Sequence, residues 1–168
     1  MDKKLVPTEV VNTYYLFEGW FNDANNNRKR DNDEPLYTGA ERFADDMTLT
    51  ASFTEDPTKW INVTLKPGDH CGGDPVTVHI PYDKTWGDIG SVGTGSIPSY
   101  LAGIEANYKP DGWYDVETNT PVENTAALAN GKVYEYRVYA DPAVFGTDVA
   151  APAAMAGIGA GGKGRITV

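Results

Sequence analysis

A Gly-Trp-aromatic motif, which we interpret as a turn, occurs twice in this sequence, at 19–21 and at 112–114, and each copy precedes a segment of alternating apolar and polar residues. Aligning Trp20 with Trp113 places the alternating segment 47–53 opposite 133–139. Alternation with a period of two marks a half-buried β-strand, because successive side chains of a strand point to opposite faces of the sheet. The repeat therefore indicates one β-rich module followed by a related module.

The two copies differ in the length of chain between the motif and the strand. Trp20 and Met47 are 27 positions apart, whereas Trp113 and Val133 are 20 positions apart. The surplus of seven residues falls at the polar loop 22–35. Surface loops lengthen at little cost in free energy, so the first copy is interpreted as the second copy with an insertion in a turn.

The predicted fold class is mainly β or α+β, with two small β-rich modules. The ten Tyr, four Trp and five Phe residues favour strands, and the eighteen Gly and eleven Pro residues supply turns. One short helix is expected at 97–104, with Ser96 as its cap and Pro98 in an early position. Strands are expected at 10–21 with a break near Glu18 and Gly19, at 47–53, and at 61–65 and 75–81 as a hairpin with a long tip. Further strands are expected at 114–122 with a turn at Asn119, and at 132–140 with Tyr134, Tyr136 and Val138 facing the core.

Three regions follow from this pattern. Residues 1–56 are a partial β-rich repeat with the inserted loop, and residues 57–142 are a complete repeat. Residues 143–168 are a Gly/Ala-rich tail or linker with little apolar surface to bury. Within this tail, residues 164–168 could add a strand to a neighbouring molecule.

The second region carries the features of a known repeat. Asp111, Gly112, Trp113 and Tyr114 are followed by a polar turn with Thr120-Pro121-Val122, by Asn124-Thr125 and by an aromatic strand that ends at Ala140. Residues 60–141 thus resemble one copy of the internalin-type B repeat, also called the Listeria–Bacteroides repeat, of bacterial surface proteins, and residues 10–55 resemble the second half of another copy. The resemblance implies a compact β-grasp-like fold with one short helix, repeated in tandem as a stalk or adhesive module. This sequence departs from the repeat in its long Gly-rich connection at 90–96 and in lacking an evident first half for the first copy.

The inserted loop has the oxygen spacing of a calcium site. Calcium prefers six to eight oxygen ligands, and short side chains at alternating positions let a tightly curled loop aim its oxygens inward. Lys29 stands at position 7, where a twelve-residue calcium loop uses a backbone carbonyl. The side-chain ligands at positions 1, 3, 5, 9 and 12 would be Asp23, Asn25, Asn27, Asp31 and Glu34.

The same string of residues resembles the calcium loops of staphylococcal Sdr-type B domains, which implies Ca²⁺ as the cofactor. One departure is Arg28 at position 6, where the usual loop has glycine for a sharp turn. The alternative interpretation is a solvated polar turn that is rich in asparagine.

Charge and composition exclude several kinds of partner. The net charge of −10 and the pI near 4.5 argue against nucleic-acid binding, and the basic cluster 28–30 lies inside the acidic loop. No apolar run approaches the length of a membrane-spanning helix, and the N-terminal residues lack the apolar region of a signal peptide. Cys71 is the only cysteine, so an intramolecular disulfide is impossible.

No catalytic motif is recognised, and the chain is predicted not to be an enzyme. His70 and Cys71 are adjacent, but they are interpreted as a polar loop, and the Gly-rich run 157–164 follows no buried strand. A self-formed Lys–Asn isopeptide bond is left open. The four tryptophans could form a sugar-stacking platform, although aromatic residues of a small domain more often form its core: Trp20, Trp60, Trp86 and Trp113.

The sequence therefore predicts a non-catalytic, calcium-stabilised structural or adhesive module of a bacterial surface or secreted protein. Its expected partners are neighbouring modules or subunits, with a host or glycan ligand as a further option. The alternative is a virion or filament subunit whose C-terminal tail adds a strand to a neighbour. A glycan-binding accessory module is the third interpretation.

Overall fold

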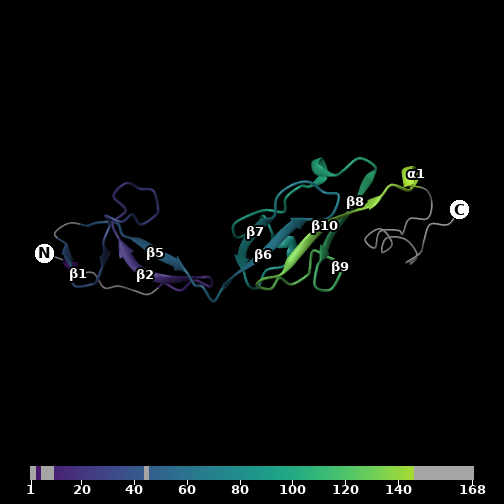
Figure 1. Ribbon diagram of the computed structural model, residues 1–168. Coiled ribbons are helices and arrows are strands. Elements are labelled where there is room, and N and C mark those ends of the chain that lie inside the picture. Colours follow the sequence, from purple (N-terminus) through teal and green to yellow (C-terminus); the bar gives the residue numbers. More distant parts are fainter. Residues whose placement is uncertain (1–2, 5–9, 44–45, 146–168) are drawn as a thin grey trace. The chain divides into compact units, whose positions relative to one another are not determined.

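The computed structural model describes residues 3–4, 10–43 and 46–145, and it divides into two compact units, Met1–Trp60 and Ile61–Val168. Strands dominate both units (Figure 1), which confirms the mainly-β prediction. The division falls four residues after the expected end of the first region. Trp60 belongs to the first unit because its ring packs edge-on against Tyr14 and Tyr15, with centroids 6.4 and 5.6 Å away.

The second unit contains a five-stranded sheet. Its strands lie in the order β7-β6-β10-β8-β9, with β6 and β10 parallel and β8 antiparallel to both β10 and β9. The strand β7 lies beside β6, the strand that precedes it in the chain, in line with the expected hairpin. The bounds are β6 Trp60–Pro67, β7 Val76–Pro81, β8 Tyr108–Asp115, β9 Thr120–Pro121 and β10 Val133–Ala140.

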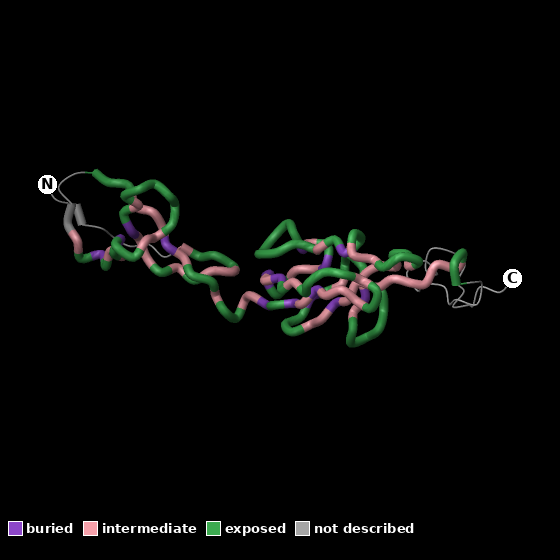
Figure 2. Tube along the Cα trace, turned by 45° about the horizontal axis from the view of Figure 1, so that its top comes forward, coloured by how far each residue is buried: buried purple, intermediate pink, exposed green. Residues whose placement is uncertain are grey.

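An apolar core forms on one face of this sheet. The alternating residues Ile61, Val63 and Leu65 of β6 are buried, and so are Val78 and Ile80 of β7, as their period of two predicts. Figure 2 shows buried positions along these strands. The rest of the core cluster is Tyr134 of β10 together with three residues of connecting segments, Trp86, Ile89 and Leu128.

The first unit contains a three-stranded antiparallel sheet in the order β3-β2-β5. Its strands are β2 Tyr15–Phe21, β3 Leu36–Tyr37 and β5 Thr50–Glu55. A separate pair joins β1 Lys3–Lys4 to β4 Arg42–Phe43. Among the described residues of this unit, Phe21 is the only hydrophobic side chain in the buried class, so this sheet covers far less core than the second unit does.

The Gly-Trp motif is a β-bulge inside a strand in both units, and its interpretation as a turn was wrong. In β2 the pairing with β5 skips Glu18, and in β8 the pairing with β10 skips Asp111. The next residues, Gly19 and Gly112, have φ of 147° and 145°. An extra residue followed by a glycine with positive φ bends the strand, and no side chain fits that backbone conformation without strain.

The strand register refines the alignment of the repeat. Trp20 pairs with Ala51 and Trp113 pairs with Tyr136, so segment 48–53 corresponds to 133–138, one residue away from the expected alignment. Phe21 pairs with Leu36 and Tyr114 pairs with Pro121, which encloses fourteen residues in the first tip and six in the second. From Leu36 to Ala51 and from Pro121 to Tyr136 the spacing is fifteen positions in both units. The insertion is therefore eight residues long and lies wholly within the tip 22–35, as the sequence indicated.

The helix expected at 97–104 is reduced to a single 3-10 turn at Leu101–Gly103, and Ser96 caps nothing because residues 96–100 are not helical. Tyr100 turns into the protein, where it is 4% exposed and its hydroxyl donates to the carbonyl of Asp74. Gly103 lies so close to Gly72 that a Cβ atom on it would approach the Gly72 carbonyl oxygen to 2.6 Å. Burial of one aromatic side chain and this backbone contact outweigh the helical spacing of the apolar residues. The other helical segments of the described residues are a 3-10 turn at Trp86–Asp88 and a four-residue helix α1 at Pro142–Phe145.

Several strand limits also differ from expectation. The strand expected at 10–21 begins at Tyr15, and the strand expected at 47–53 begins at Thr50. The strand expected at 114–122 is two elements, since β8 ends at Asp115 and β9 is confined to Thr120–Pro121. The turn at Asn119 is confirmed, with φ of 55°. Of the predicted tail 143–168, only residues 143–145 are described, and they belong to α1; the rest lies outside the described residues.

Candidate metal site

The candidate calcium loop is the long tip that connects β2 to β3 in the first unit (Figure 1). Every predicted ligand lies in this tip, between Phe21 and Leu36, which pair with one another across the hairpin. The closing pair fixes both ends of the loop. The fourteen residues between them must satisfy their polar groups within the loop or with water.

The backbone of the loop curls through two left-handed residues, Asn26 with φ of 57° and Arg28 with φ of 63°. Arg28 thus adopts the conformation that glycine provides at this position in a usual calcium loop. For a residue with a side chain, this conformation costs about 1–2 kcal/mol, and asparagine tolerates it better than arginine. The loop therefore has the predicted sharp turn in spite of its arginine.

Short side chains inside the curl accept hydrogen bonds from the backbone. The two carboxylate oxygens of Asp23 accept from the N–H groups of Asn27, at 3.1 Å, and Arg28, at 2.8 Å. The amide oxygen of Asn25 accepts from Asn27 N–H at 3.0 Å, and that of Asn27 accepts from Lys29 N–H at 2.8 Å. These bonds hold the side chains at positions 1, 3 and 5 against the inner side of the turn.

Asp31 brings the second half of the loop to the first. One of its carboxylate oxygens, Oδ2, accepts from Nδ2 of Asn25 at 2.7 Å and from Nδ2 of Asn27 at 2.8 Å. The positive ends of two amide dipoles thus lie at this carboxylate. A cation bound beside Asp31 would require each amide to rotate, so that its oxygen replaces its nitrogen.

Glu34 closes the loop. Its side chain is one of two buried polar side chains among the described residues, at 6% exposure. Its Oε1 accepts from Ala24 N–H at 2.9 Å and its Oε2 accepts from Asp31 N–H at 3.0 Å. A buried carboxylate needs such donors to offset its lost hydration, and here the donors come from both ends of the loop.

The structure therefore brings five of the predicted ligands into one hydrogen-bonded loop: Asp23, Asn25, Asn27, Asp31 and Glu34. Lys29 is exposed, and its described contact is the N–H bond to Asn27. Within the described part of the chain, no three His, Cys, Asp or Glu side chains form a metal-binding group. Carboxylates alone do not make a site here, so a cation would also need the amide and backbone oxygens of the loop.

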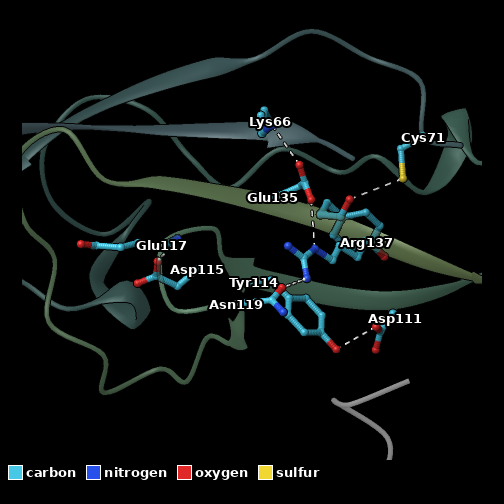
Figure 3. A network of polar contacts seen from close by, with 10 residues as sticks. Lys66, Cys71, Asp111, Tyr114, Asp115, Glu117, Asn119, Glu135 and Arg137 are labelled. Carbon is cyan, nitrogen blue, oxygen red and sulfur yellow. Dashed lines mark hydrogen bonds and ion pairs between the residues drawn. The ribbon is translucent and has the colours of Figure 1, made fainter. Parts of the chain in front are cut away.

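A polar network on the second unit was not anticipated from the sequence (Figure 3). Glu135 of β10 accepts from Lys66 of β6 and from Arg137 of β10, each at 2.9 Å. Arg137 also donates to Asn119 Oδ1 at 2.6 Å, and its guanidinium lies 4.6 Å from the centre of the Tyr114 ring. Burial alone would raise the pKa of Glu135, but the hydrogen bonds from Lys66 and Arg137 hold it below its usual range. The network connects side chains of three neighbouring strands, β6, β8 and β10.

Lys132 is held as an ammonium by two carboxylates. Lys132 Nζ lies 2.5 Å from Asp115 and 3.1 Å from Glu117, and these hydrogen bonds raise the pKa of the lysine. The pKa of Asp115 is lowered, since the bonds from Lys132 and backbone N–H groups outweigh its desolvation. Isopeptide formation needs a neutral amine to attack the side-chain carbonyl, so this ionised pair disfavours it.

His70 and Cys71 lack the arrangement of a catalytic pair. His70 Nδ1 lies 2.9 Å from Glu105, and its ring stacks on Tyr108 at 4.0 Å. Cys71 donates to the Tyr136 carbonyl, with sulfur and oxygen 3.6 Å apart, and burial raises the pKa of the thiol. The raised pKa favours the thiol form, which is the weaker nucleophile.

The tryptophans are used in packing. Trp86 is 5% exposed, and its ring lies 5.5 Å from that of Trp113 and 4.9 Å from that of Tyr134. Trp60 donates its indole N–H to the Tyr14 carbonyl at 2.9 Å, and Trp20 packs edge-on against Phe17 at 5.7 Å. These packing contacts agree with the interpretation that the aromatic residues of a small domain mostly form its core.

Comparison with known proteins gives no relative: no family model, curated protein or solved structure matches the chain. Within the described residues, no helix has both the length and the apolar character that crossing a membrane requires.

Proposed function

We propose that the chain is a non-catalytic structural module of an extracellular or cell-surface assembly, and that one Ca²⁺ ion stabilises the tip 22–35. The observation that carries the proposal is the placement of the insertion. Two hairpins of equal register differ by eight residues at one tip, and that tip holds the five oxygen-bearing side chains at calcium-loop spacing.

Geometry supports calcium over a smaller divalent cation. Asp23 and Asp31 contribute from opposite halves of the curl, and Glu34 joins its ends from a buried position. The loop is otherwise mostly exposed and has no large apolar side chain to bury. Calcium accepts an irregular shell of six to eight oxygens, whereas magnesium requires near-octahedral geometry and retains its water.

The expected affinity suits an extracellular setting. The amide rotations at Asn25 and Asn27 reduce the free energy available for binding, because each amide gives up its hydrogen bond to Asp31. Extracellular calcium modules have dissociation constants of about 0.1–1 mM, and this loop belongs in that range. In such a module the ion orders a loop that has no core of its own, and partners would be neighbouring modules.

A calcium titration followed by NMR tests the proposal. The side-chain amide resonances of Asn25 and Asn27 should shift during titration of the chelator-treated protein, because both amides turn when their oxygens ligate the ion. Asp31→Asn should weaken binding by roughly tenfold or more, since it removes a charged ligand. Magnesium at the same concentrations should give smaller shifts.

The matched control is Asp33→Asn, which removes an exposed carboxylate at position 11 of the same loop. This variant should retain the affinity of the unaltered protein. Equal weakening by both substitutions would show that the loop attracts cations only through its net charge, and unchanged amide resonances up to 10 mM Ca²⁺, about ten times the upper expected dissociation constant, would end the calcium proposal.

A further inference from the structure

The two larger sheets of the described residues end in four edge strands, β7, β9, β3 and β5. An edge strand presents backbone N–H and C=O groups that can pair with another chain, and natural proteins protect such edges with short strands, prolines, charges or covering segments. The strands β3 and β9 are two residues long, and β9 contains Pro121. The strand β7 ends at Pro81, and on its outer side His79 exchanges backbone hydrogen bonds with Thr94 at 3.0 and 2.7 Å. Three of the four edges are therefore protected.

The remaining edge, β5, lacks these protections along most of its length. It is six residues long and, among the described residues, pairs with β2 alone. Segment 47–54 contains no proline, glycine or charged residue. An edge in water usually carries charges, yet Glu135 and Arg137 lie on the interior strand β10, and Thr50 and Ser52 occupy the corresponding positions of β5. The composition of β5 is thus that of a strand with a neighbour on both sides.

The register shows which backbone groups of β5 point away from β2. In the second unit the carbonyl of Tyr136 accepts from the N–H of Gly68 at 2.9 Å, on the side of β10 where β6 lies. Tyr136 pairs with Trp113 as Ala51 pairs with Trp20, so Ala51 presents its N–H and C=O on the outer side of β5. Every second residue of a strand does the same, and Phe53 therefore presents its own groups on this side.

We propose that the edge of β5 pairs with β5 of a second copy of this chain, in an antiparallel arrangement about a two-fold axis at Ser52. Each copy then places Ala51 opposite Phe53 of the other, and each of these two pairs exchanges two backbone hydrogen bonds. The register covers all of β5, because residues 49–55 of one copy lie opposite residues 55–49 of the other. The inference is independent of the calcium proposal.

The sequence of β5 is complementary to itself in this register. Thr50 lies beside Thr54 of the second copy, and the half-buried ring of Phe53 lies beside Ala51. Facing threonines stabilise antiparallel sheets, whereas like charges that face each other destabilise them. The one charged residue of the strand, Glu55, lies opposite Leu49, so like charges do not meet. A two-fold axis is also the commonest symmetry of protein oligomers, since one surface then serves both partners.

The contact is small, so the dimer is expected to be weak. Two paired edge strands bury less area than the roughly 1,200 Å² of the smaller stable interfaces. Each copy also carries a net charge of −10, and this repulsion opposes association at low ionic strength. Salt screens the repulsion without weakening backbone pairing, so dimerisation should increase with salt concentration.

Disulfide trapping of the full chain tests both the contact and its register. In a Cys71→Ser background, the Thr50→Cys variant is mixed with an equal amount of the Thr54→Cys variant. Facing residues that do not exchange backbone bonds have Cα atoms about 4.5 Å apart, which is within disulfide range. Mild oxidation of the mixture should therefore give a cross-linked heterodimer. Either variant alone should remain largely monomeric, because its cysteine lies four residues along the strand, about 14 Å, from the same cysteine of the second copy.

The matched control replaces Thr50→Cys in the mixture by Thr48→Cys. This change moves the thiol two residues along the same face of the strand, about 8 Å from its partner, and should reduce cross-linking at least tenfold. Equal cross-linking in the mixture, in the control and in the single variants would indicate random collision and overturn the inference.

Sedimentation of the unaltered chain provides a second measurement that needs no substitution. The protein should associate into dimers as its concentration rises to about 1 mM, a range suited to a weak contact, and more strongly at high salt. A monomer under all these conditions would leave the edge to a different partner and would overturn the inference. Dimers whose thiols at positions 50 and 54 fail to cross-link would assign association to another surface, with the same consequence.

Discussion

The hairpins β2–β3–β5 and β8–β9–β10 share a bulge, a register and a spacing, yet they end in different tips. Glu18-Gly19-Trp20 and Asp111-Gly112-Trp113 each place an acidic residue at the bulge, and each acid binds a neighbour across the sheet or along the strand. Glu18 accepts from the Ser52 hydroxyl at 2.6 Å, and Asp111 accepts from the Tyr114 hydroxyl at 2.8 Å. The shared features are those that fix the strand geometry. The tip can change in length without altering this strand geometry.

A second difference lies in what covers the two hairpins. Tyr134 and Trp113 are packed with β6, β7 and the segment around Trp86, whereas Phe21 is the one hydrophobic side chain of the first unit in the buried class among the described residues. Stability from apolar burial is therefore concentrated in the second unit. The first unit has fewer buried apolar side chains among its described residues and depends more on its polar loop. Substitutions can test this unequal distribution.

The largest effect is expected from Leu65→Ala in the second unit. Leu65 is 0% exposed, and truncation of a buried leucine costs about 2–5 kcal/mol of unfolding free energy. Urea titration monitored by the amide resonances of β10 and β5 should show a loss of stability in β10. The control Leu101→Ala alters a side chain that is 57% exposed and should change the free energy by less than about 0.5 kcal/mol. A loss of the same size in both variants would contradict the location of the core.

The shared bulge predicts a pair of intermediate effects. Gly19→Ala and Gly112→Ala each place a side chain where φ is 147° or 145°, at a cost of about 1–3 kcal/mol. Each substitution should destabilise its own unit, as measured by urea titration of resonances from β2 and β8. If alanine is tolerated at one glycine and not at the other, the two bulges are not equivalent.

A smaller effect is expected from the ion pair of Lys132 and Asp115, at a position where the first unit has no such pair. The lowered pKa of Asp115 means that its contribution is present above its unfolded pKa and is lost as the pH falls toward the folded value. The raised pKa of Lys132 means that its contribution is complete below its unfolded pKa and is lost at strongly alkaline pH. Asp115→Asn should cost about 0.5–1 kcal/mol at pH 7 and should flatten the acid limb of the urea midpoint against pH. An acid limb identical to that of the unaltered protein would contradict this assignment.

The smallest effect concerns Glu41 in the first unit. Hydrogen bonds from Thr38 and the neighbouring backbone lower its pKa to about 2, and its contribution to stability is lost as the pH falls from its ordinary value to that value. A carbon-detected NMR titration of the carboxyl group should give this pKa, and Thr38→Val should raise it by removing the hydroxyl bond of 2.9 Å. A midpoint near 4.5 in the unaltered protein would contradict the described turn.

The parts of this fold that the sequence predicted are those governed by local periodicity. The alternation of Ile61, Val63 and Leu65 specified a buried face without reference to any partner. The bulge at Gly112 was missed because a Gly-Trp pair has the composition of a turn, and only the opposite strand shows that pairing continues past it. The apolar residues of segment 97–104 have helical spacing, but the expected helix does not form there. Gly103 instead contacts Gly72, which is about thirty positions away in the sequence.

The same distinction applies to the candidate site. Spacing alone placed Asp23 and Asp31 in one loop, because a loop of that length between paired strands must fold back on itself. Spacing could not show that Glu34 is buried with both oxygens engaged, since that depends on how the loop closes on the hairpin. Arg137 and Glu135 were missed because polar residues that alternate along a strand are typical of a solvated face. Their network with Lys66 involves a strand distant in sequence.

The central claim is that the eight-residue insertion gives the first hairpin its cation site. Replacement of the long tip by the short tip of the second hairpin tests this claim directly. In the exchanged protein, the six residues 115–120 replace residues 22–35, while both closing pairs remain. Calorimetric titration of the unaltered, chelator-treated chain should show one Ca²⁺ bound with a dissociation constant of about 0.1–1 mM, and the exchanged protein should show none. Equal binding by both proteins, or binding by neither, would contradict the account.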